Sequence, residues 1–149
     1  MENRSILVLF VCVHNSARSQ MAEAFFNFYA PPWMRAESAG ITPGELNPLA
    51  VKVMAEKGID ISSHTTKSAF DLYRQGRTYD YVITVCEKEA AERCPIFPGK
   101  NIRLEWSFPN PAHFTGTEEE KLHTMRRLRD DIEHHVRSFL ETEGLLTER

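Results

Sequence analysis

Residues 5–29 read SILVLFVCVHNSARSQMAEAFFNFY, and this stretch decides the fold of the chain. Its first part, Ser5 to Val11, is almost continuously apolar with several β-branched residues, which predicts a strand buried on both faces, as in a parallel sheet. A polar turn follows, and Ser19 to Tyr29 then predicts a helix that Pro31 and Pro32 stop. A buried strand that leads through a short loop into a helix is the opening unit of an α/β domain.

The rest of the chain continues this alternation. Further strands are expected at Met34–Ser38, Tyr79–Val85 and Ile102–Glu105, and helices at Pro48–Lys57, Ser68–Arg74, within Glu87–Arg93 and at Thr117–Leu140. Thr117 and Glu120 have the spacing of a capping box. The connections are too short for two domains. We therefore predict a three-layer α/β fold, in which a four-stranded parallel sheet has helices on both faces. It would form one domain over residues 1–149, with its core at about 5–140 and a tail at 143–149.

Composition and charge exclude several classes of protein. The 149 residues include 18 Lys and Arg and 21 Asp and Glu, for a formal net charge of −3, so no cationic field favours nucleic acid. The longest apolar run, Ile6 to Val13, is far shorter than the ~20 residues of a membrane helix and lacks a signal-peptide cleavage site. Three cysteines are an odd count for a disulfide-stapled secreted domain and are more typical of thiols in a reducing compartment. We expect a cytoplasmic protein without a membrane partner.

The loop between the first strand and the first helix carries the strongest functional signal. Ligands of parallel sheets bind beyond the carboxyl ends of the strands, and a helix N-terminus offers unpaired N–H groups and partial positive charge. Arg18 adds a planar fork for two oxygens, so the loop predicts an oxyanion site. Cys12 at its base would have a stabilised thiolate and act as a nucleophile. The residues expected to bind the anion are Val13, His14, Asn15, Ser16, Ala17, Arg18 and Ser19.

An ordinary turn after a buried cysteine is the simpler interpretation of this loop. The spacing of Cys12, Arg18 and Ser19, the preceding buried strand and the helix start all agree with the oxyanion site instead. His14 is expected to be an exposed spacer inside the loop. Asn15 is suited to the left-handed backbone that such loops often use.

The segment FVCVHNSARSQMAEAFFN, residues 10–27, resembles the low-molecular-weight protein tyrosine phosphatases. It is more similar to the thioredoxin-coupled arsenate reductases built on that fold, because Arg18–Glu23 (RSQMAE) is typical of the reductase branch. The resemblance spans about Ile6 to Leu140. Other matching pieces are Glu37–Gly40, Gly58–Ser62, Cys86, Cys94–Pro95, Trp106–Ala112 and Arg126–Asp130.

The resemblance implies a three-cysteine relay that reduces arsenate to arsenite. Cys12 would attack arsenate, Cys86 would attack Cys12 and release arsenite, and Cys94 would then form a disulfide with Cys86. Thioredoxin would reduce that disulfide as an external reductant, with no bound cofactor and no metal. The catalytic residues are then Cys12, Arg18, Cys86 and Cys94. Two alternatives stay open for the later cysteines: a core Cys86 with an incidental Cys94, and a zinc site, although a C-x-x-C pair is missing.

One position departs from the family pattern. The general acid of the phosphatases, an Asp, is matched here by Asn110, and an amide cannot supply the proton that typically contributes ~10²–10⁴-fold to the rate. Glu105 and His113 are nearby in sequence but are expected to be surface residues. The departure favours a reductase. It leaves open a phosphatase that forms a Cys12 phosphoenzyme, and a non-catalytic oxyanion-binding or redox-sensing protein.

Residues around the loop are expected to support it. Ser38 should hydrogen-bond the anion loop together with Asn15, and Asn110 should line the site. Some family members hold potassium near the loop, at positions matched here by Asn15, Glu23 and Ser38, but the fourth position is Lys67, whose ammonium would disfavour a cation. We therefore predict no dependence on potassium. The basic cluster of Arg126, Arg127 and Arg129 is interpreted as a solvated helix face.

Overall fold

A computed structural model describes residues 5–143 as a four-stranded parallel sheet in the order β2-β1-β3-β4. The strands are β1 (Ile6–Cys12), β2 (Met34–Gly40), β3 (Tyr81–Thr84) and β4 (Ile102–Glu105). The helices are α1 (Arg18–Tyr29), α2 (Pro48–Ala55), α3 (Ala69–Arg74), α4 (Lys88–Ala91) and α5 (Glu118–Thr142), with a 3₁₀ turn η1 at Pro111–His113. The predicted fold class is confirmed.

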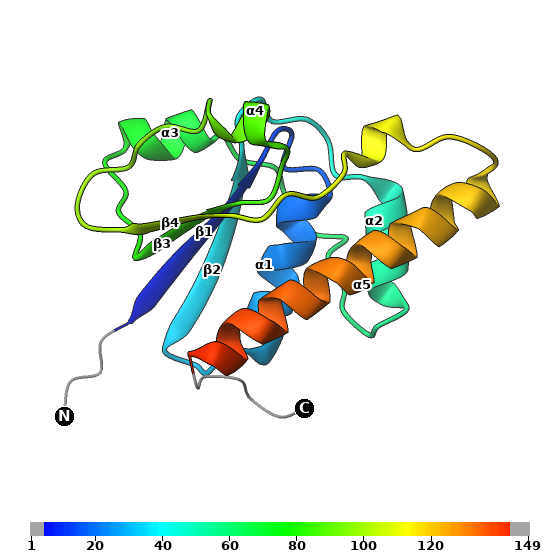
Figure 1. The fold of residues 1–149 in the computed structure, drawn as a ribbon, viewed down its shortest axis with the longest axis horizontal. Helices are drawn as coiled ribbons and strands as arrows, with labels where there is room; N and C mark the ends of the chain where they lie inside the picture. The colour runs from blue at the N-terminus through cyan, green and yellow to red at the C-terminus, as the bar shows by residue number, and fades with distance from the viewer. Residues whose placement is uncertain (1–4, 144–149) are drawn as a thin grey trace.

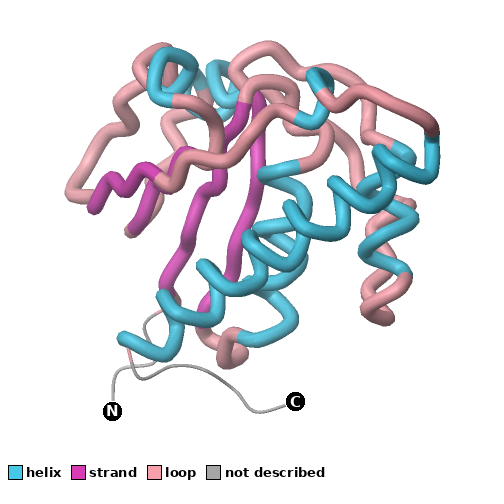
Figure 2. Tube along the Cα trace, turned by 45° about the vertical axis from the view of Figure 1, so that its right-hand side comes forward, coloured by secondary structure: helices cyan, strands magenta, loops and turns pink. Residues whose placement is uncertain are grey.

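The helices cover both faces of the sheet. Figure 1 shows α1, α2 and the long α5 gathered on one side, with the short α3 and α4 on the other, near the carboxyl ends of the strands. In Figure 2 the loops that follow the strands collect at this same end. Within the described residues, no helix is both long and apolar enough to cross a membrane.

The strand order places a switch point at the end of β1. The chain leaves β1 toward β2 on one side and returns to pair β3 on the other, so the loops after β1 and β3 diverge. Ligands of open parallel sheets bind at such a point. The middle of β1, Val8 to Val11, is fully buried, as its apolar run predicts.

Element boundaries differ from the sequence prediction by one or two residues. Strand β2 continues through Gly40 because this residue pairs with Cys12 of β1. The strand expected at Tyr79–Val85 is limited to Tyr81–Thr84, although Asp80 and Val85 still donate N–H bonds to β1. The capping box of Thr117 and Glu120 at the start of α5 is confirmed. Of the expected tail, Glu143 caps α5, and residues 144–149 lie outside the described part of the chain.

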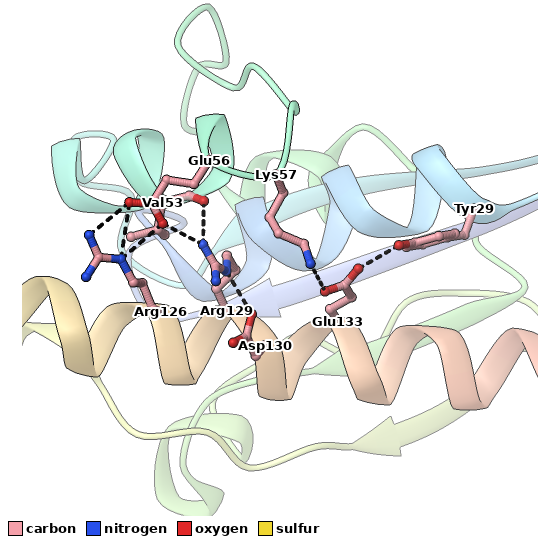
Figure 3. A network of polar contacts seen from close by, with 8 residues as sticks. All are labelled: Tyr29, Val53, Glu56, Lys57, Arg126, Arg129, Asp130 and Glu133. Atoms are coloured by element: carbon pink, nitrogen blue, oxygen red, sulfur yellow. Dashed lines mark hydrogen bonds and ion pairs between the residues drawn. The ribbon is translucent and has the colours of Figure 1, made fainter. Parts of the chain in front are cut away.

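The basic cluster on α5 is not simply a solvated face, and this prediction was wrong for Arg129. Its side chain is buried, and its Nη1 donates to the Val53 carbonyl at 2.9 Å and to Glu56 at 2.8 Å (Figure 3). Val53 lies in the last turn of α2, where carbonyls lack helical partners, so Arg129 caps that helix from α5. Arg126 forks onto the Glu56 carboxylate, and Arg127 alone of the three is exposed.

Further along α5, a second set of polar contacts joins this helix to its neighbours. Glu133 accepts the Tyr29 hydroxyl at 2.6 Å and pairs with the Lys57 ammonium at 3.1 Å (Figure 3). Because Tyr29 ends α1 and Lys57 follows α2, Glu133 joins α5 to both helices. The polar face of α5 therefore fixes the helical layer as its apolar face packs on the core.

Replacing Arg129 should destabilise the fold. Arg129→Met keeps much of the side-chain volume but leaves the Val53 carbonyl without its side-chain donor and removes one of the two arginines that bind Glu56, so the free energy of unfolding should fall by about 2 kcal/mol. Arg127→Met at the neighbouring exposed position should change it by less than about 0.5 kcal/mol. Urea denaturation of both variants measures the difference. Equal stability of the two variants would contradict the capping role.

Candidate active site

Four carbonyl groups of the loop after β1 point toward the segment after β2. The carbonyls of Cys12, Val13, His14 and Ser16 accept N–H bonds of 2.7–3.0 Å from Ile41, Thr42, Gly44 and Asn47. The Asn15 carbonyl instead accepts from the Gln20 side chain of α1 at 3.1 Å. Because the carbonyls from residue 12 to residue 16 all have partners outside the loop, the N–H groups of the loop are left to face its centre.

These N–H groups form an anion cradle, the loop of residues 13–19. Within residues 5–143, the structure records one hydrogen bond from the N–H groups of residues 13–18, from Asn15 to the Cys12 sulfur at 3.2 Å. Helix α1 starts at Arg18, and no side chain caps its N-terminus at Ala17. Unpaired N–H groups and the positive end of the helix dipole together favour an oxyanion above Cys12.

Gly40 allows the loop to close. A Cβ atom at this position would lie 2.8 Å from the Asn15 nitrogen and 2.8 Å from the His14 carbonyl carbon. Real Cβ atoms essentially never approach backbone atoms so closely, so any larger residue would push the loop away from β2. Position 40 therefore requires glycine because the backbone of residues 13–15 packs directly on it.

Asn15 is the centre of the polar network beneath the cradle. It is fully buried with φ of 56°, which confirms the predicted left-handed backbone. Its Nδ2 donates to Ser19 at 2.7 Å and to Ser38 at 3.0 Å, and its Oδ1 accepts the Lys67 N–H at 2.9 Å. Ser38 in turn donates to Glu23. The side chain therefore ties the cradle to α1, β2 and the loop before α3.

The thiol of Cys12 lies at the base of this network. Its sulfur is 2.9 Å from the Ser19 hydroxyl. Ser19 accepts from Asn15 and has one hydroxyl hydrogen that it can donate to the sulfur of a thiolate. Together with the Asn15 N–H, Cys12 thus has two neighbouring groups able to donate to a thiolate nucleophile.

Arg18 is buried at the first position of α1, with 2% of its surface exposed. Its Nη1 donates to Glu87 at 3.0 Å and to the Phe108 carbonyl at 3.2 Å. Within residues 5–143, the structure records no acceptor for its Nε or Nη2. The guanidinium therefore keeps one edge with two parallel donors, the geometry that binds two oxygens of a tetrahedral anion.

A cleft of about 410 Å³ opens above the cradle. The loop contributes one wall. Glu45 and Leu46 before α2, with Leu49 in the first turn of α2, form a second wall, and the start of η1 forms a third. Asn110 stands on the third wall, where its Oδ1 caps η1 by accepting the Ala112 N–H at 3.0 Å. Glu105 and His113, the possible substitutes for the missing acid, are exposed and do not line the cleft.

The other two cysteines, Cys86 and Cys94, are also buried free thiols. Cys86 follows β3, the strand beside β1, and Val85 donates its N–H to Val11 at 2.8 Å. Burial raises the pKa of Cys86 to about 11, and the neighbouring charges of Cys12 and Cys94 act in the same direction. Burial also raises the pKa of Cys94, although the charge of Arg103 and its hydrogen bond act in the opposite direction. Cys86 therefore lies close enough to Cys12 and to Cys94 to be influenced by both.

Comparisons with known proteins agree with this geometry. The sequence matches the family of low molecular weight phosphotyrosine protein phosphatases over residues 7–148. The chain belongs to this family. It is 42% identical to an arsenate reductase of Bacillus subtilis over 143 residues, which cover 95% of this chain and 99% of that protein.

Solved structures of family members share the fold. A crystal structure of an arsenate reductase from Archaeoglobus fulgidus superposes with a TM-score of 0.71 at 32% identity, covering 90% of this chain and 98% of that one. A thioredoxin-dependent arsenate reductase of Corynebacterium glutamicum gives a TM-score of 0.68 at 30% identity, over 93% of this chain and 61% of that one.

The polar cluster at positions where some family members hold potassium does not fit a cation here. Asn15 Oδ1 accepts N–H groups from Lys67 and from Gln20, so it is already occupied by donors. The Lys67 ammonium contacts the Thr65 carbonyl at 3.4 Å, and this carbonyl also accepts from Gln20. Zinc also lacks ligands, since no three His, Cys, Asp or Glu side chains within residues 5–143 are grouped to hold a metal.

Three residues of the site were missed by the sequence analysis. Gln20 bridges the cradle to Thr65 and accepts from the His64 ring at 2.8 Å. Gln20 belongs to the RSQMAE motif, which was used only for its resemblance, and His64 belongs to no motif that we singled out. Glu87 pairs with Arg18 across 69 positions of sequence. Its place directly after Cys86 was the available signal, because residues at the end of β3 must lie beside those at the end of β1.

Gly40→Ala should deform the cradle, because overpacking against backbone costs about 1–3 kcal/mol. We expect inorganic phosphate to protect Cys12 from alkylation about tenfold less well in this variant than in the parent protein. Gly44→Ala is the control, since its Cβ would meet the side chains of His14 and Ser16 at an ordinary 3.4 Å. Mass spectrometry of the alkylated peptide measures both. Unchanged protection in Gly40→Ala would contradict the packing argument.

Proposed function

We propose that this protein is an arsenate reductase that works through Cys12, Cys86 and Cys94 and is regenerated by thioredoxin. The observation that carries the proposal is a buried thiol at the base of an N–H-lined anion cradle, with a second thiol at the end of the adjacent strand. The close relative of Bacillus subtilis named arsenate reductase supports the choice of substrate.

In the first step the cradle holds a tetrahedral arsenate. The loop N–H groups and the free edge of Arg18 bind its oxygens and neutralise their charge. The Cys12 thiolate, held by Ser19 and Asn15, attacks arsenic. A sulfur–arsenic bond forms, and one oxygen leaves as water after it takes up a proton.

In the next steps the electrons come from thiols. Cys86 attacks the Cys12 sulfur, a disulfide forms, and the electron pair of the sulfur–arsenic bond reduces arsenic, which leaves as arsenite. Cys94 then attacks the sulfur of Cys86 and frees the Cys12 thiolate. Net, arsenate and two thiols give arsenite, water and one disulfide, and the dithiol of thioredoxin returns the enzyme to its starting state.

The resting protein keeps the second and third thiols unreactive. The thiolate is the attacking form, and a pKa of about 11 leaves Cys86 almost entirely protonated at neutral pH. Burial has the same effect on Cys94. Both residues are thereby protected from exchange with unrelated disulfides until Cys12 has formed its adduct.

A thioredoxin partner supplies the electrons, so we assign no bound cofactor. The thioredoxin-dependent relative of Corynebacterium glutamicum supports this partner. We place the enzyme in the cytoplasm, where the disulfide can be reduced in each cycle. The whole activity is assigned to one domain, in which the anion cradle and all three cysteines contact the same sheet.

Phosphatase activity on aryl phosphates is the second candidate, and the cleft disfavours it. The walls that the structure describes above Cys12 carry Leu46, Pro48 and Leu49 but no phenyl, phenol or indole ring to stack on an aryl group. Asn110 stands where a proton donor would serve the leaving oxygen. Both features suit a small inorganic oxyanion better than a phosphotyrosine.

Cys94→Ser should separate the two halves of the cycle. One arsenite per chain is expected, because Cys12 and Cys86 can still react, and recycling by thioredoxin should stop at a trapped Cys12–Cys86 disulfide. Cys86→Ser should release no arsenite. Peptide mapping and arsenite quantification after a single turnover distinguish these outcomes. Full thioredoxin-driven turnover of Cys94→Ser would rule out the relay. If the parent protein itself formed no arsenite from arsenate, a non-catalytic oxyanion sensor would be favoured.

Asn110→Asp should increase the hydrolysis of p-nitrophenyl phosphate by about tenfold or more, because general acid catalysis typically contributes ~10²–10⁴-fold. The carboxylate can still accept the Ala112 N–H, so η1 should persist. Gln75→Glu, an exposed position at the end of α3, controls for the added charge. No increase over that control would show that position 110 does not reach the leaving oxygen.

A further inference from the structure

Glu87 contacts the anion-binding arginine and has no part in the relay described above. Its carboxylate lies 3.0 Å from Arg18 Nη1. This contact joins the start of α1, which carries the anion-binding arginine, to the residue that follows Cys86. The Arg18 side chain is 3% exposed and that of Glu87 is 39% exposed. The ion pair therefore forms at the boundary between the buried site and solvent.

The geometry of the contact leaves the anion-binding edge of Arg18 intact. Nη1 carries two hydrogens, and these are directed at Glu87 and at the Phe108 carbonyl. Arg18 lines the cleft, whereas Glu87 and Phe108 do not. The two acceptors thus hold the guanidinium from behind and keep its Nε and Nη2 donors available to an oxyanion.

Glu87 is ionised in the resting protein. Its partial burial would raise its pKa, but the bonds from its own backbone N–H and from Arg18 outweigh this effect and hold the pKa below its usual range. Charge–charge attraction to His113 acts in the same direction. A charged acceptor binds a guanidinium more strongly than a neutral one.

The position of Glu87 also depends on the cysteines. It is bonded directly to Cys86 and forms the N-cap of α4, whose helix lies between Cys86 and Cys94. Cys86 and Cys94 are free thiols in this structure, so a disulfide between them requires their sulfur atoms to approach to about 2 Å. Because Glu87 is the residue next to Cys86, this approach moves its backbone and shifts its carboxylate relative to Arg18.

We infer that Glu87 couples the anion cradle to the redox state of the cysteine segment. In the dithiol form Glu87 is a positioning residue that holds Arg18 in its anion-binding orientation. In the Cys86–Cys94 disulfide form this support is withdrawn, and the cradle binds oxyanions more weakly. The second half of the inference rests on the proposed relay, whereas the first half depends only on the reduced structure.

The coupling gives the cycle an order. Weaker binding in the disulfide form lets the cradle empty after turnover and keeps a new oxyanion from occupying an enzyme that cannot reduce it. By linkage, an oxyanion that prefers the dithiol form also favours that form at equilibrium. Reduction of the disulfide then restores the Arg18 support and the affinity together.

The reduced protein tests the positioning role. Glu87→Gln keeps an acceptor for Nη1 and Glu87→Ala removes it, while both lose the same negative charge, so their comparison isolates the hydrogen bond. Calorimetry with inorganic phosphate should give about tenfold weaker binding for Glu87→Ala than for Glu87→Gln. The pair Glu89→Ala and Glu89→Gln, at an exposed position of α4, should not differ. Equal or tighter binding by Glu87→Ala would overturn the positioning role.

The oxidised protein tests the coupling. One equivalent of arsenate accepts two electrons from Cys86 and Cys94 and leaves as arsenite and water, and peptide mapping verifies the disulfide. Phosphate should then bind the parent protein about tenfold more weakly than before, and Glu87→Ala should change by less than about twofold. An intact disulfide with unchanged phosphate affinity would overturn the coupling and leave the proposed function standing. Failure of arsenate to form the disulfide would contradict the proposed function, while the reduced variants still decide the role of Glu87.

Discussion

The backbone hydrogen bonds between residues 12–16 and residues 41–47 are the constraint on which the site depends. They hold the carbonyls of the loop against the segment after β2 and leave its N–H groups directed inward. A loop of the same sequence without that partner segment would have no reason to expose its donors on one side. Gly40 permits the close approach, and Asn15 fixes the loop from below through its left-handed backbone and its side-chain bonds.

The parallel sheet turns this local arrangement into a reactive one. Because β3 pairs with the opposite edge of β1 from β2, the thiol after β3 lies beside the thiol after β1. Burial of Cys86 raises its pKa and keeps this thiol protonated. One sheet edge thus holds an anion-facing thiol and a protected thiol next to each other, which is the order that sequential thiol exchange needs.

Rigid and changeable parts of the molecule are separated. The layer of α1, α2 and α5 is joined by buried or bidentate contacts, with Arg129 and Glu133 at its centre (Figure 3). The segment between Cys86 and Cys94, residues 87–93, contains only the four-residue helix α4 and contacts the site through Glu87. This segment can move during disulfide exchange without disturbing the helices that support the cradle.

Local sequence determined the elements and the chemistry of the first site. The apolar run before Cys12, the prolines after Tyr29 and the Thr117–Glu120 box act over a few residues, so the strand, the helix and the long C-terminal helix follow from them. The conformation of Asn15 was predictable for the same reason. Tertiary structure alone decided the contacts between distant segments. Arg129 lies in a charged run that would be solvated on an isolated helix, and only packing against the end of α2, with a hydrogen bond to the Val53 carbonyl, buries it. The role of Glu87 depends on its contact with Arg18, and the need for glycine at position 40 depends on the loop of residues 13–15. Both contacts are set by strand order and packing, not by neighbouring residues in the sequence.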